Sequence, residues 1–141
     1  MDNIISSRAF TELDQAEFAR ISGDFNPIHV DTATARRSGP GALIVHGIHN
    51  LLWCIDTIAP AIPGGLSVSG LRVNFDTFVS INEQADVVLV QTSVQQLRAE
   101  VRVRGTLALT ALIYFGDTLA ALPAAKPVDL VNPLAPMDVQ F

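Results

Sequence analysis

The segment from Ser22 to Asp31 gathers side chains that can accept and donate protons. It reads Ser-Gly-Asp-Phe-Asn-Pro-Ile-His-Val-Asp, so two carboxylates, one amide and one imidazole share a short stretch. Carboxylates and imidazoles are the usual groups of general acid–base catalysis. Because the rest of the chain is rich in apolar residues, a loop this polar is the first place to expect chemistry.

A short helix is expected to lead into this segment. Asp14 has the character of a helix N-cap, and Glu17 three residues later would complete a capping box. The helix is expected over residues 15–21, after a short strand or an extended lead-in over residues 8–13. Gly23 follows the helix and favours its termination.

The longest apolar block, residues 42–59, follows a helical turn that is expected over residues 32–37 with Asp31 as its cap. Because the opposite side of the block, with Trp53 and Cys54, is not polar either, its helix is expected to be buried nearly all round. The apolar residues at helical spacing are Ile48, Leu51, Leu52, Ile55 and Ile58.

From Leu66 onward the apolar period changes to two, which is typical of strands. Strands are expected from Leu66, over residues 85–94, around Val101 and Val103, and over residues 107–115. Because these runs are close in sequence, they predict an antiparallel meander. A lone apolar helix can be covered on all sides only by a sheet that wraps around it. The predicted fold class is therefore α+β, with a long central helix wrapped by a curved antiparallel sheet.

The overall composition excludes several classes of function. The formal net charge is −5, with a single lysine, Lys126, and no basic run, so nucleic-acid binding is not expected. No apolar run approaches the roughly 20 residues of a membrane span. The first residues, Met1 to Ile4, lack the order of a signal peptide. With Cys54 as the single cysteine, no internal disulfide is possible. A cytoplasmic protein is expected.

The apolar content also predicts self-association. Hydrophobic residues make up 49% of the chain and charged residues 16%, which is more apolar surface than one small domain readily hides. The final part, residues 122–141, has prolines and alanines without a period and predicts an extended arm or a linker.

Two separated motifs identify a family resemblance. The first is Ser22-Gly23-Asp24-x-Asn26-Pro27-x-His29-x-Asp31, and the second is Ile44-Val45-His46-Gly47, with a weaker echo in Val73-Asn74-Phe75. In these motifs the chain resembles the MaoC-like, (R)-specific enoyl-CoA hydratases, which have a hotdog fold. The resemblance covers residues 8–117 and implies a dehydratase domain over 1–121 with a tail or linker over 122–141. It also implies a homodimer whose sheets join edge to edge, with the active sites near the interface.

The resemblance implies hydration of trans-2-enoyl thioesters, or the reverse dehydration of (R)-3-hydroxyacyl thioesters. Asp24 and His29 would share the acid and base roles on one bound water, without an assignment of which is which. Gly47, in the first turn of the buried helix, would offer its N–H to the thioester oxygen.

Four other residues are assigned to the substrate side of this site. Asn26 is expected to orient the loop or the water, and Ser22 to hydrogen-bond within the loop. His46 is expected to be a structural histidine whose ring bonds the loop, in preference to a catalytic one. Trp53 is expected to lie in the core or to line the pocket. We interpret Asp31 as a helix cap rather than a reacting group.

The expected partner is an acyl-CoA or acyl-carrier-protein thioester, and no cofactor is expected. Arg36 and Arg37 could meet the CoA phosphates or be ordinary exposed arginines. His46 and His49 lie one turn apart, and with His29 they raise the question of a metal site. The nearby carboxylates do not follow a known zinc spacing, so no metal is expected.

Two departures from the family pattern bear on substrate choice. Gly39-Pro40-Gly41 stands where the family often has an aromatic residue, and Phe78 and Asn82-Glu83 stand where it has Pro and Gly-Asp. Both changes are expected to reshape the acyl pocket or the loop over it. A hotdog thioesterase and a non-catalytic docking or dimerisation module of a larger protein are the alternative functions.

Overall fold

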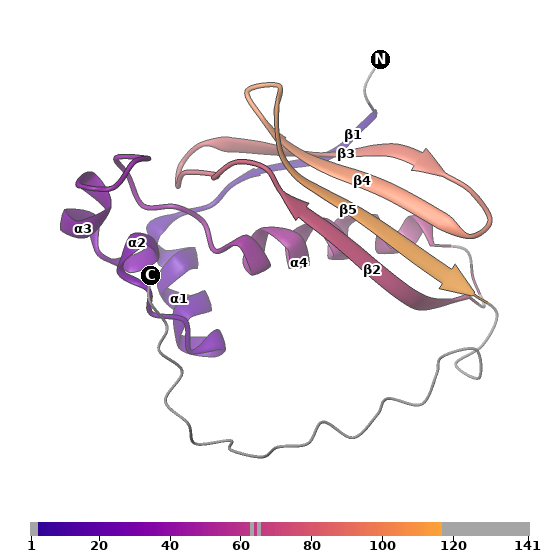
Figure 1. Ribbon diagram of the computed structural model, residues 1–141, viewed down its shortest axis with the longest axis horizontal. Coiled ribbons are helices and arrows are strands. Elements are labelled where there is room, and N and C mark those ends of the chain that lie inside the picture. Colours follow the sequence, from indigo (N-terminus) through magenta and orange to yellow (C-terminus); the bar gives the residue numbers. More distant parts are fainter. Residues whose placement is uncertain (1–2, 63, 65, 117–141) are drawn as a thin grey trace.

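The computed structural model describes residues 3–62, 64 and 66–116. In this part of the chain five strands form one antiparallel sheet, and helix α4 lies along its concave face (Figure 1). The prediction of an α+β fold with a central helix and a curved antiparallel sheet is confirmed. Among the described residues, no helix is long and apolar enough to cross a membrane. The elements are β1 (Asn3–Ala9), α1 (Glu12–Ser22), α2 (Pro27–Val30), α3 (Thr32–Arg36), α4 (Gly47–Ile58), η1 (Ala59–Ala61), β2 (Ser67–Phe75), β3 (Gln84–Thr92), β4 (Gln96–Val103) and β5 (Thr106–Gly116).

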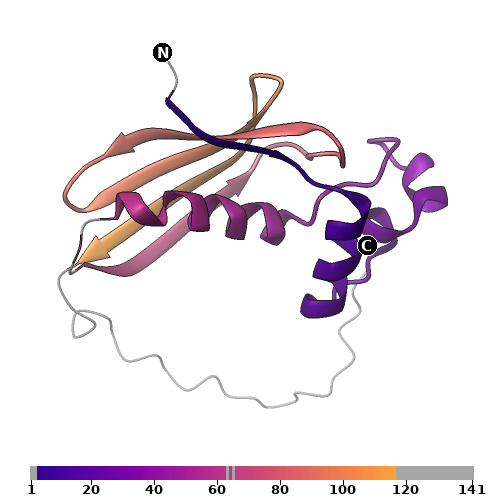
Figure 2. The same ribbon diagram turned by 180° about the vertical axis from the view of Figure 1, so that it is seen from behind.

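The strand order is β1-β3-β4-β5-β2. The meander prediction is correct for β3, β4 and β5, and Arg104 and Gly105 make the tight reversal between the last two with φ of 52° and 73°. It is wrong for β2, which pairs with β5 and forms one edge of the sheet. Residues 76–83 carry the chain from that edge across to β3, and the Asp76 N–H bonds the carbonyl of Ala108 on the way. The other edge is β1, which Figure 2 shows leading directly into α1.

Helix α1 begins earlier than predicted. Its N-cap is Thr11, whose hydroxyl accepts the Asp14 N–H at 3.1 Å, while the Asp14 carboxylate accepts the Thr11 N–H at 2.8 Å. Asp14 is therefore the third helical residue of the capping box, and the prediction of Asp14 as N-cap with Glu17 is wrong. The strand predicted over residues 8–13 also lies earlier, over Asn3–Ala9. Helix α1 ends as expected, with Gly23 in the left-handed region at φ 80°.

The polar segment contains an element that we did not predict. Pro27–Val30 forms the one-turn helix α2, with Asn26 as N-cap and Pro27 in its first turn. Helix α3 follows at once, and the prediction of Asp31 as its cap is confirmed, since its carboxylate accepts the N–H groups of Ala33 and Thr34.

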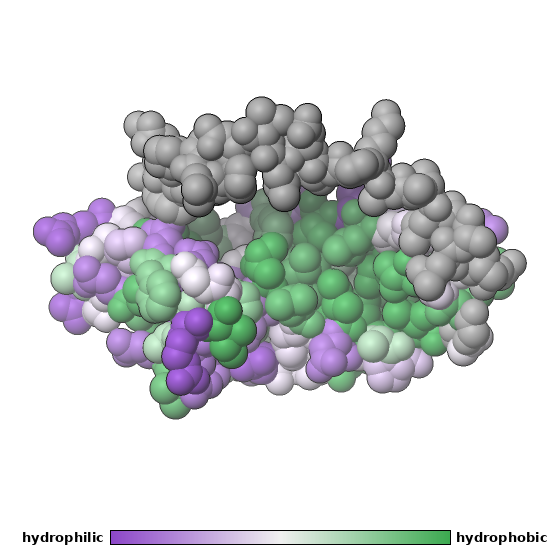
Figure 3. Space-filling model, turned by 90° about the horizontal axis from the view of Figure 1, so that it is seen from below, coloured by the Kyte–Doolittle hydropathy of each residue, from purple (hydrophilic) through white to green (hydrophobic). Residues whose placement is uncertain are grey.

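Helix α4 buries one face against the sheet through Asn50, Leu51, Cys54 and Ile58. The expectation of burial nearly all round is wrong for the single chain, because Ile48 and Leu52 are 54% and 51% exposed. Among the described residues the sheet ends at β2, and no strand covers that side of α4. Figure 3 shows apolar side chains gathered over this face.

Cys54 is fully buried in the core, as expected, and burial raises the pKa of its thiol to about 12. The predictions for the tail over residues 122–141 and for the domain boundary at 121 lie outside the described residues.

Candidate active site

The end of α1, the short helix α2 and the start of α4 meet at one end of the molecule (Figure 1). This meeting point brings together Asp24, His29, His46 and Gly47, which come from both sequence motifs. The two motifs, which are separated in sequence, therefore lie next to each other in the structure. The Ile44 N–H, which bonds the Ile28 carbonyl at 3.1 Å, ties the second motif to α2.

Asp24 lies on the loop between α1 and α2. Its Oδ1 accepts the Asn26 N–H at 3.1 Å, so the loop backbone fixes the carboxylate. Its Oδ2 lies 3.9 Å from Nε2 of His29 and 3.9 Å from Nε2 of His46. The side chain is 46% exposed, so Asp24 forms the solvent-facing side of the cluster.

His29 is buried beneath Asp24. Its Nδ1 lies 2.8 Å from the carbonyl oxygen of Ile44. Because a carbonyl can only accept, Nδ1 carries the proton, and in the neutral ring Nε2 presents a lone pair toward Asp24. Burial lowers the pKa of His29 from its ordinary 6.5. His46 acts in the same direction, while Ile44 and Asp24 oppose it.

His46 is the N-cap residue of α4 and is 2% exposed. Its backbone N–H and its Nδ1 lie 2.9 and 2.8 Å from Oε1 of Gln15, and its Nε2 lies 3.0 Å from the Asp24 carbonyl oxygen. Because a neutral imidazole has one ring N–H, the ring donates to only one of these two acceptors at a time, and the bond of the ring to the loop stays a prediction. His46 thus lies between α1, the polar loop and α4.

Gly47 is the first residue of α4 and faces the cluster. In the described part of the chain no acceptor pairs with its N–H, as is usual in the first turn of a helix. A Cβ built on Gly47 would lie 3.1 Å from Cε1 of Phe75. Gly47 therefore leaves room for both the Phe75 ring and an incoming ligand atom.

Ser22 and Asn26 hold the loop, as expected. The Ser22 hydroxyl accepts the Asp24 N–H at 3.1 Å, and Oδ1 of Asn26 accepts the Ile28 N–H at 3.2 Å. Ser22 also lines a cavity beside Asp24, while Asn26 acts through the backbone of α2.

Trp53 is not brought to the cluster. It packs edge-on against Phe10 with centroids 5.6 Å apart, and it lines a separate groove with Arg8 and His49. His49 stacks on Phe18 with centroids 4.5 Å apart.

Two cavities meet at Gly47 and Phe75. The larger of the two, of about 390 Å³, is lined by His29, Asn50 and Phe78 among others. The smaller, of about 260 Å³, is lined by Asp24, His46 and Ser22 among others. The Asp24–His29 pair thus lies on the boundary between two spaces that share Gly47 and Phe75. A ligand could occupy both spaces while its middle lies beside Gly47 and Phe75.

Two residues of the site were not predicted, Gln15 and Asn50. Gln15 is fully buried on α1, and its partner His46 is far away in sequence. Asn50 is a polar residue inside an apolar helical block, and this contrast is the sequence feature that could have pointed to it. Neither residue was predicted to belong to the site, because a polar residue in a helix is ordinarily exposed to solvent.

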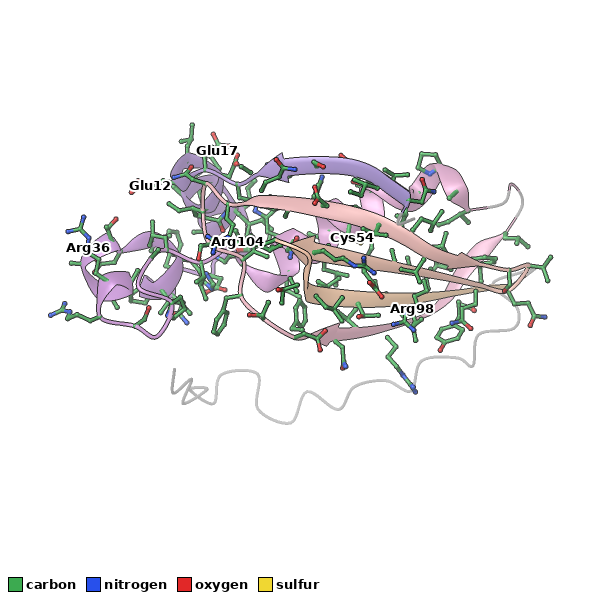
Figure 4. All side chains as sticks on the ribbon, turned by 90° about the horizontal axis from the view of Figure 1, so that it is seen from above. Glu12, Glu17, Arg36, Cys54, Arg98 and Arg104 are labelled. Atoms are coloured by element: carbon green, nitrogen blue, oxygen red, sulfur yellow. The ribbon has the colours of Figure 1, made fainter. Side chains whose placement is uncertain are left out.

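Both departures from the family pattern lie near the larger cavity. Phe78 lines this cavity, and a neighbouring hollow is lined by Phe78, Thr77 and Ser80 together with Gly39 and Pro40. The two segments therefore lie side by side. Arg36, in contrast, points outward from α3 (Figure 4).

Asp24, His29 and His46 each offer one possible metal-binding atom, and these atoms lie within 4.8 Å of one another. The His46 atom that faces the others is Nε2, which already lies at hydrogen-bond distance from the Asp24 carbonyl. Metal binding would break this contact. The geometry fits proton transfer better than metal binding, and the absence of a metal and of a cofactor stays a prediction.

Comparison with known proteins places the chain in a family. The model of the MaoC like domain matches residues 4–112. A 3-hydroxybutyryl-CoA dehydratase of Methylorubrum extorquens is 31% identical over 131 residues, which cover 89% of this chain and 81% of the relative. An (R)-hydratase from A. caviae superposes with a TM-score of 0.65 at 24% identity, covering 84% of this chain and 92% of that one. An (R)-hydratase of Pseudomonas aeruginosa gives 0.66 at 21% identity, covering 78% and 76%. These structures confirm the hotdog fold, and the chain belongs to the MaoC-like dehydratase family.

Proposed function

We propose that this protein adds water to trans-2-enoyl thioesters to give (R)-3-hydroxyacyl thioesters, and catalyses the reverse dehydration. The observation that carries the proposal is the separation of 3.9 Å between Oδ2 of Asp24 and Nε2 of His29, beside the Gly47 N–H, which has no acceptor among the described residues. The name of the M. extorquens relative supports a CoA thioester as substrate. The handedness is taken from the two (R)-hydratases of the same fold.

The reaction requires one water between the two side chains. Two hydrogen bonds of about 2.8 Å that meet at one water oxygen can span this separation at a bent angle. One of the pair, Asp24 or His29, takes a proton from the water as its oxygen bonds C3, and this proton is passed on to C2, so both fragments of the same water add to the substrate and the two side chains return to their starting protonation. Both new bonds then form on one face of the double bond.

Negative charge grows on the thioester oxygen as the water adds. The Gly47 N–H at the positive end of α4 is placed to stabilise this charge. With the thioester oxygen at Gly47, the acyl chain occupies the cavity lined by His29 and Asn50. The thioester sulfur and the carrier bound to it then point into the cavity lined by Ser22 and Asp24.

The test follows the loss of enoyl absorbance with crotonyl-CoA and 2-octenoyl-CoA, and a stereospecific dehydrogenase reports the handedness of the product. Asp24→Asn and His29→Gln are each expected to lower kcat by about 100- to 10,000-fold. Asp31→Asn is the matched control, because it removes a nearby carboxylate but keeps a side chain that caps α3. Full hydratase activity in either site variant would overturn the proposal. Release of free thiol from saturated acyl-CoA would instead indicate a thioesterase.

We also propose a homodimer formed along the β2 edge. The apolar side chains on β2 and the adjoining face of α4 that are 47–54% exposed include Ile48, Leu52, Leu71 and Phe75. Phe75 lines both cavities, so a second copy on this face would lie beside the active site. Light scattering is expected to give a dimer, and Leu71→Arg a monomer. Val94→Arg is the control, since Val94 is 82% exposed in the β3–β4 turn, and a dimeric Leu71→Arg protein would contradict this arrangement.

A further inference from the structure

Phe78 lies in the segment that leads from β2 across to β3. Its side chain is 61% exposed, although the next residue, Val79, is buried. Phe78 lines the larger cavity, and it also lines the neighbouring hollow, which has a volume of about 360 Å³. Thr77 is likewise shared by the two linings. The larger cavity and the hollow therefore meet at Thr77 and Phe78.

The backbone on both sides of Phe78 is held by hydrogen bonds. Before it, the Thr77 N–H bonds the carbonyl of Ala108 at 3.3 Å. After it, the Val79 carbonyl accepts the Val45 N–H at 2.8 Å. Because the chain is fixed on both sides, Phe78 can adjust to a ligand mainly by changing its side-chain rotamer. The ring, rather than the backbone, therefore limits the space at this boundary.

The hollow on the far side of the ring has room for further ligand atoms. It is lined there by Gly39 and Pro40, which lie in the turn after α3. A Cβ built on Gly39 would meet no atom of the described residues within 4 Å. The Phe78 ring thus stands between the larger cavity and a second space that a longer ligand could use.

We propose that the Phe78 ring sets the maximum length of the acyl chain that the protein accepts. This inference rests on the proposed function, under which the acyl chain occupies the larger cavity. Much of the lining of this cavity is apolar, for example Ile28, Val45 and Val79, so it suits a hydrocarbon chain. A chain that reaches Phe78 must displace the ring or bend. In an apolar pocket a single methylene group changes kcat/KM by about 10- to 200-fold.

The experiment measures kcat/KM for the series of 2-enoyl-CoA substrates from crotonyl-CoA to 2-hexadecenoyl-CoA, in steps of two carbons. Turnover of crotonyl-CoA tests the proposed function, while the length at which kcat/KM falls tests Phe78. In the wild-type protein, kcat/KM is expected to fall by about tenfold or more within one step of the series. Phe78→Ala is expected to move this fall to longer chains by at least one step, because truncation of the ring opens the hollow to the chain.

Gly39→Leu is the matched control, because Gly39 lies on the far side of the ring and its φ is outside the left-handed region. With Phe78 in place, the added side chain is expected to leave the maximum length unchanged. Combined with Phe78→Ala, it is expected to refill the hollow and to return the fall in kcat/KM to the wild-type length. Phe78→Ala is expected to fold, because the side chain that it truncates is mostly exposed.

A binding measurement tests the same limit without turnover. Calorimetry compares saturated acyl-CoA thioesters of the same lengths, which have no double bond to hydrate. Beyond the limit, the wild-type dissociation constant is expected to rise about tenfold, and Phe78→Ala is expected to abolish this rise for the next longer chain.

The two measurements separate the two proposals. If the binding limit moves in Phe78→Ala but no enoyl-CoA turns over, the proposed function fails and the role of Phe78 stands. If wild type and Phe78→Ala show the same length dependence, or if neither shows a fall up to the longest chain, the role of Phe78 is overturned even where the hydratase activity is present. If no acyl-CoA binds or reacts, both proposals fail.

Discussion

The imidazole rings of His29 and His46 are stacked, with centroids 3.9 Å apart and planes inclined by 24°. Each ring is held by an acceptor from a different segment, His29 by the carbonyl of Ile44 and His46 by Oε1 of Gln15. The position of the reacting ring therefore depends on α1 through Gln15, although Gln15 lines neither cavity. We describe Gln15 as a positioning residue.

Replacing Gln15 tests this dependence. Gln15→Leu leaves the backbone N–H and the Nδ1 of His46 without their acceptor, and it is expected to lower the free energy of unfolding by about 2 kcal/mol. It is also expected to lower kcat by about tenfold or more with little change in KM, because the substrate contacts remain. Gln15→Glu keeps an acceptor and should recover part of kcat. Equal kcat in Gln15→Leu and wild type, measured with crotonyl-CoA, would contradict the positioning role.

The pH dependence of His29 follows from its surroundings. Burial lowers its pKa below 6.5, whereas the Asp24 carboxylate raises it. His29 is therefore expected to titrate below about pH 6.5, and Asp24→Asn is expected to move the titration to still lower pH. Nuclear magnetic resonance of the ring carbons measures both values. An unchanged or higher pKa in Asp24→Asn would show that the carboxylate does not act on His29.

The lowered pKa of His29 also makes the free energy of unfolding depend on pH. As the pH falls below 6.5, the unfolded chain takes up a proton at His29 before the native protein does, so stability decreases with falling pH. His29→Gln removes this contribution and is expected to flatten the acid side of the stability curve, as measured by urea unfolding between pH 5 and 8.

Several parts of the fold could be read from local sequence. Gly23 ends α1, Asp31 caps α3 and Gly105 allows the reversal into β5, because these features depend on the residues themselves and their immediate neighbours. The edge position of β2 was not predicted, since it depends on long-range pairing with β5. The exposure of Ile48 depends in turn on where the sheet ends.

In the candidate site, too, the residues in local motifs could be predicted, and those that depend on long-range contacts could not. The motif residues Asp24, His29 and Gly47 could be found because they come in two compact blocks, and the structure brings them together. Gln15 and Asn50 could not, since each is a single polar residue whose role depends on a partner or a cavity that only the folded chain provides. Trp53 was expected in the core or at the pocket, and the structure supports the first alternative, since its ring packs against the core beside Phe10.

The close approach of Phe75 to Gly47 gives a steric prediction. Gly47→Ala keeps the backbone N–H and is expected to fold at least as well as wild type, because Ala is the better helix former by about 1 kcal/mol. The added methyl would lie 3.1 Å from the Phe75 ring and must displace it or the substrate. We expect kcat/KM for crotonyl-CoA to decrease by about 100-fold. Adding Phe75→Leu should restore part of this loss, and no recovery would indicate a cause other than crowding.

His49 is predicted to be replaceable with a gain in stability. Its ring stacks on Phe18 and lies 4.9 Å from Phe10, but its Nδ1 is buried without a partner in the described part of the chain. Burial and the nearby Arg8 lower its pKa, and the opposing effect of Asp14 is smaller. His49→Phe keeps the ring contacts and removes the unpaired nitrogen, so the free energy of unfolding is expected to rise by about 1 kcal/mol at pH 8.

The gain from His49→Phe should be larger at pH 5 than at pH 8. With the pKa of native His49 below its ordinary value, the unfolded wild-type chain binds the extra proton as the pH falls, and the phenylalanine variant has no such proton to bind. Urea unfolding at both pH values measures the difference, with His49→Gln as the control that removes the charge but also the stacked ring. A variant that is less stable than wild type at both pH values would show that Nδ1 has a partner in solution. A gain of equal size at both would show that His49 titrates normally in the folded protein.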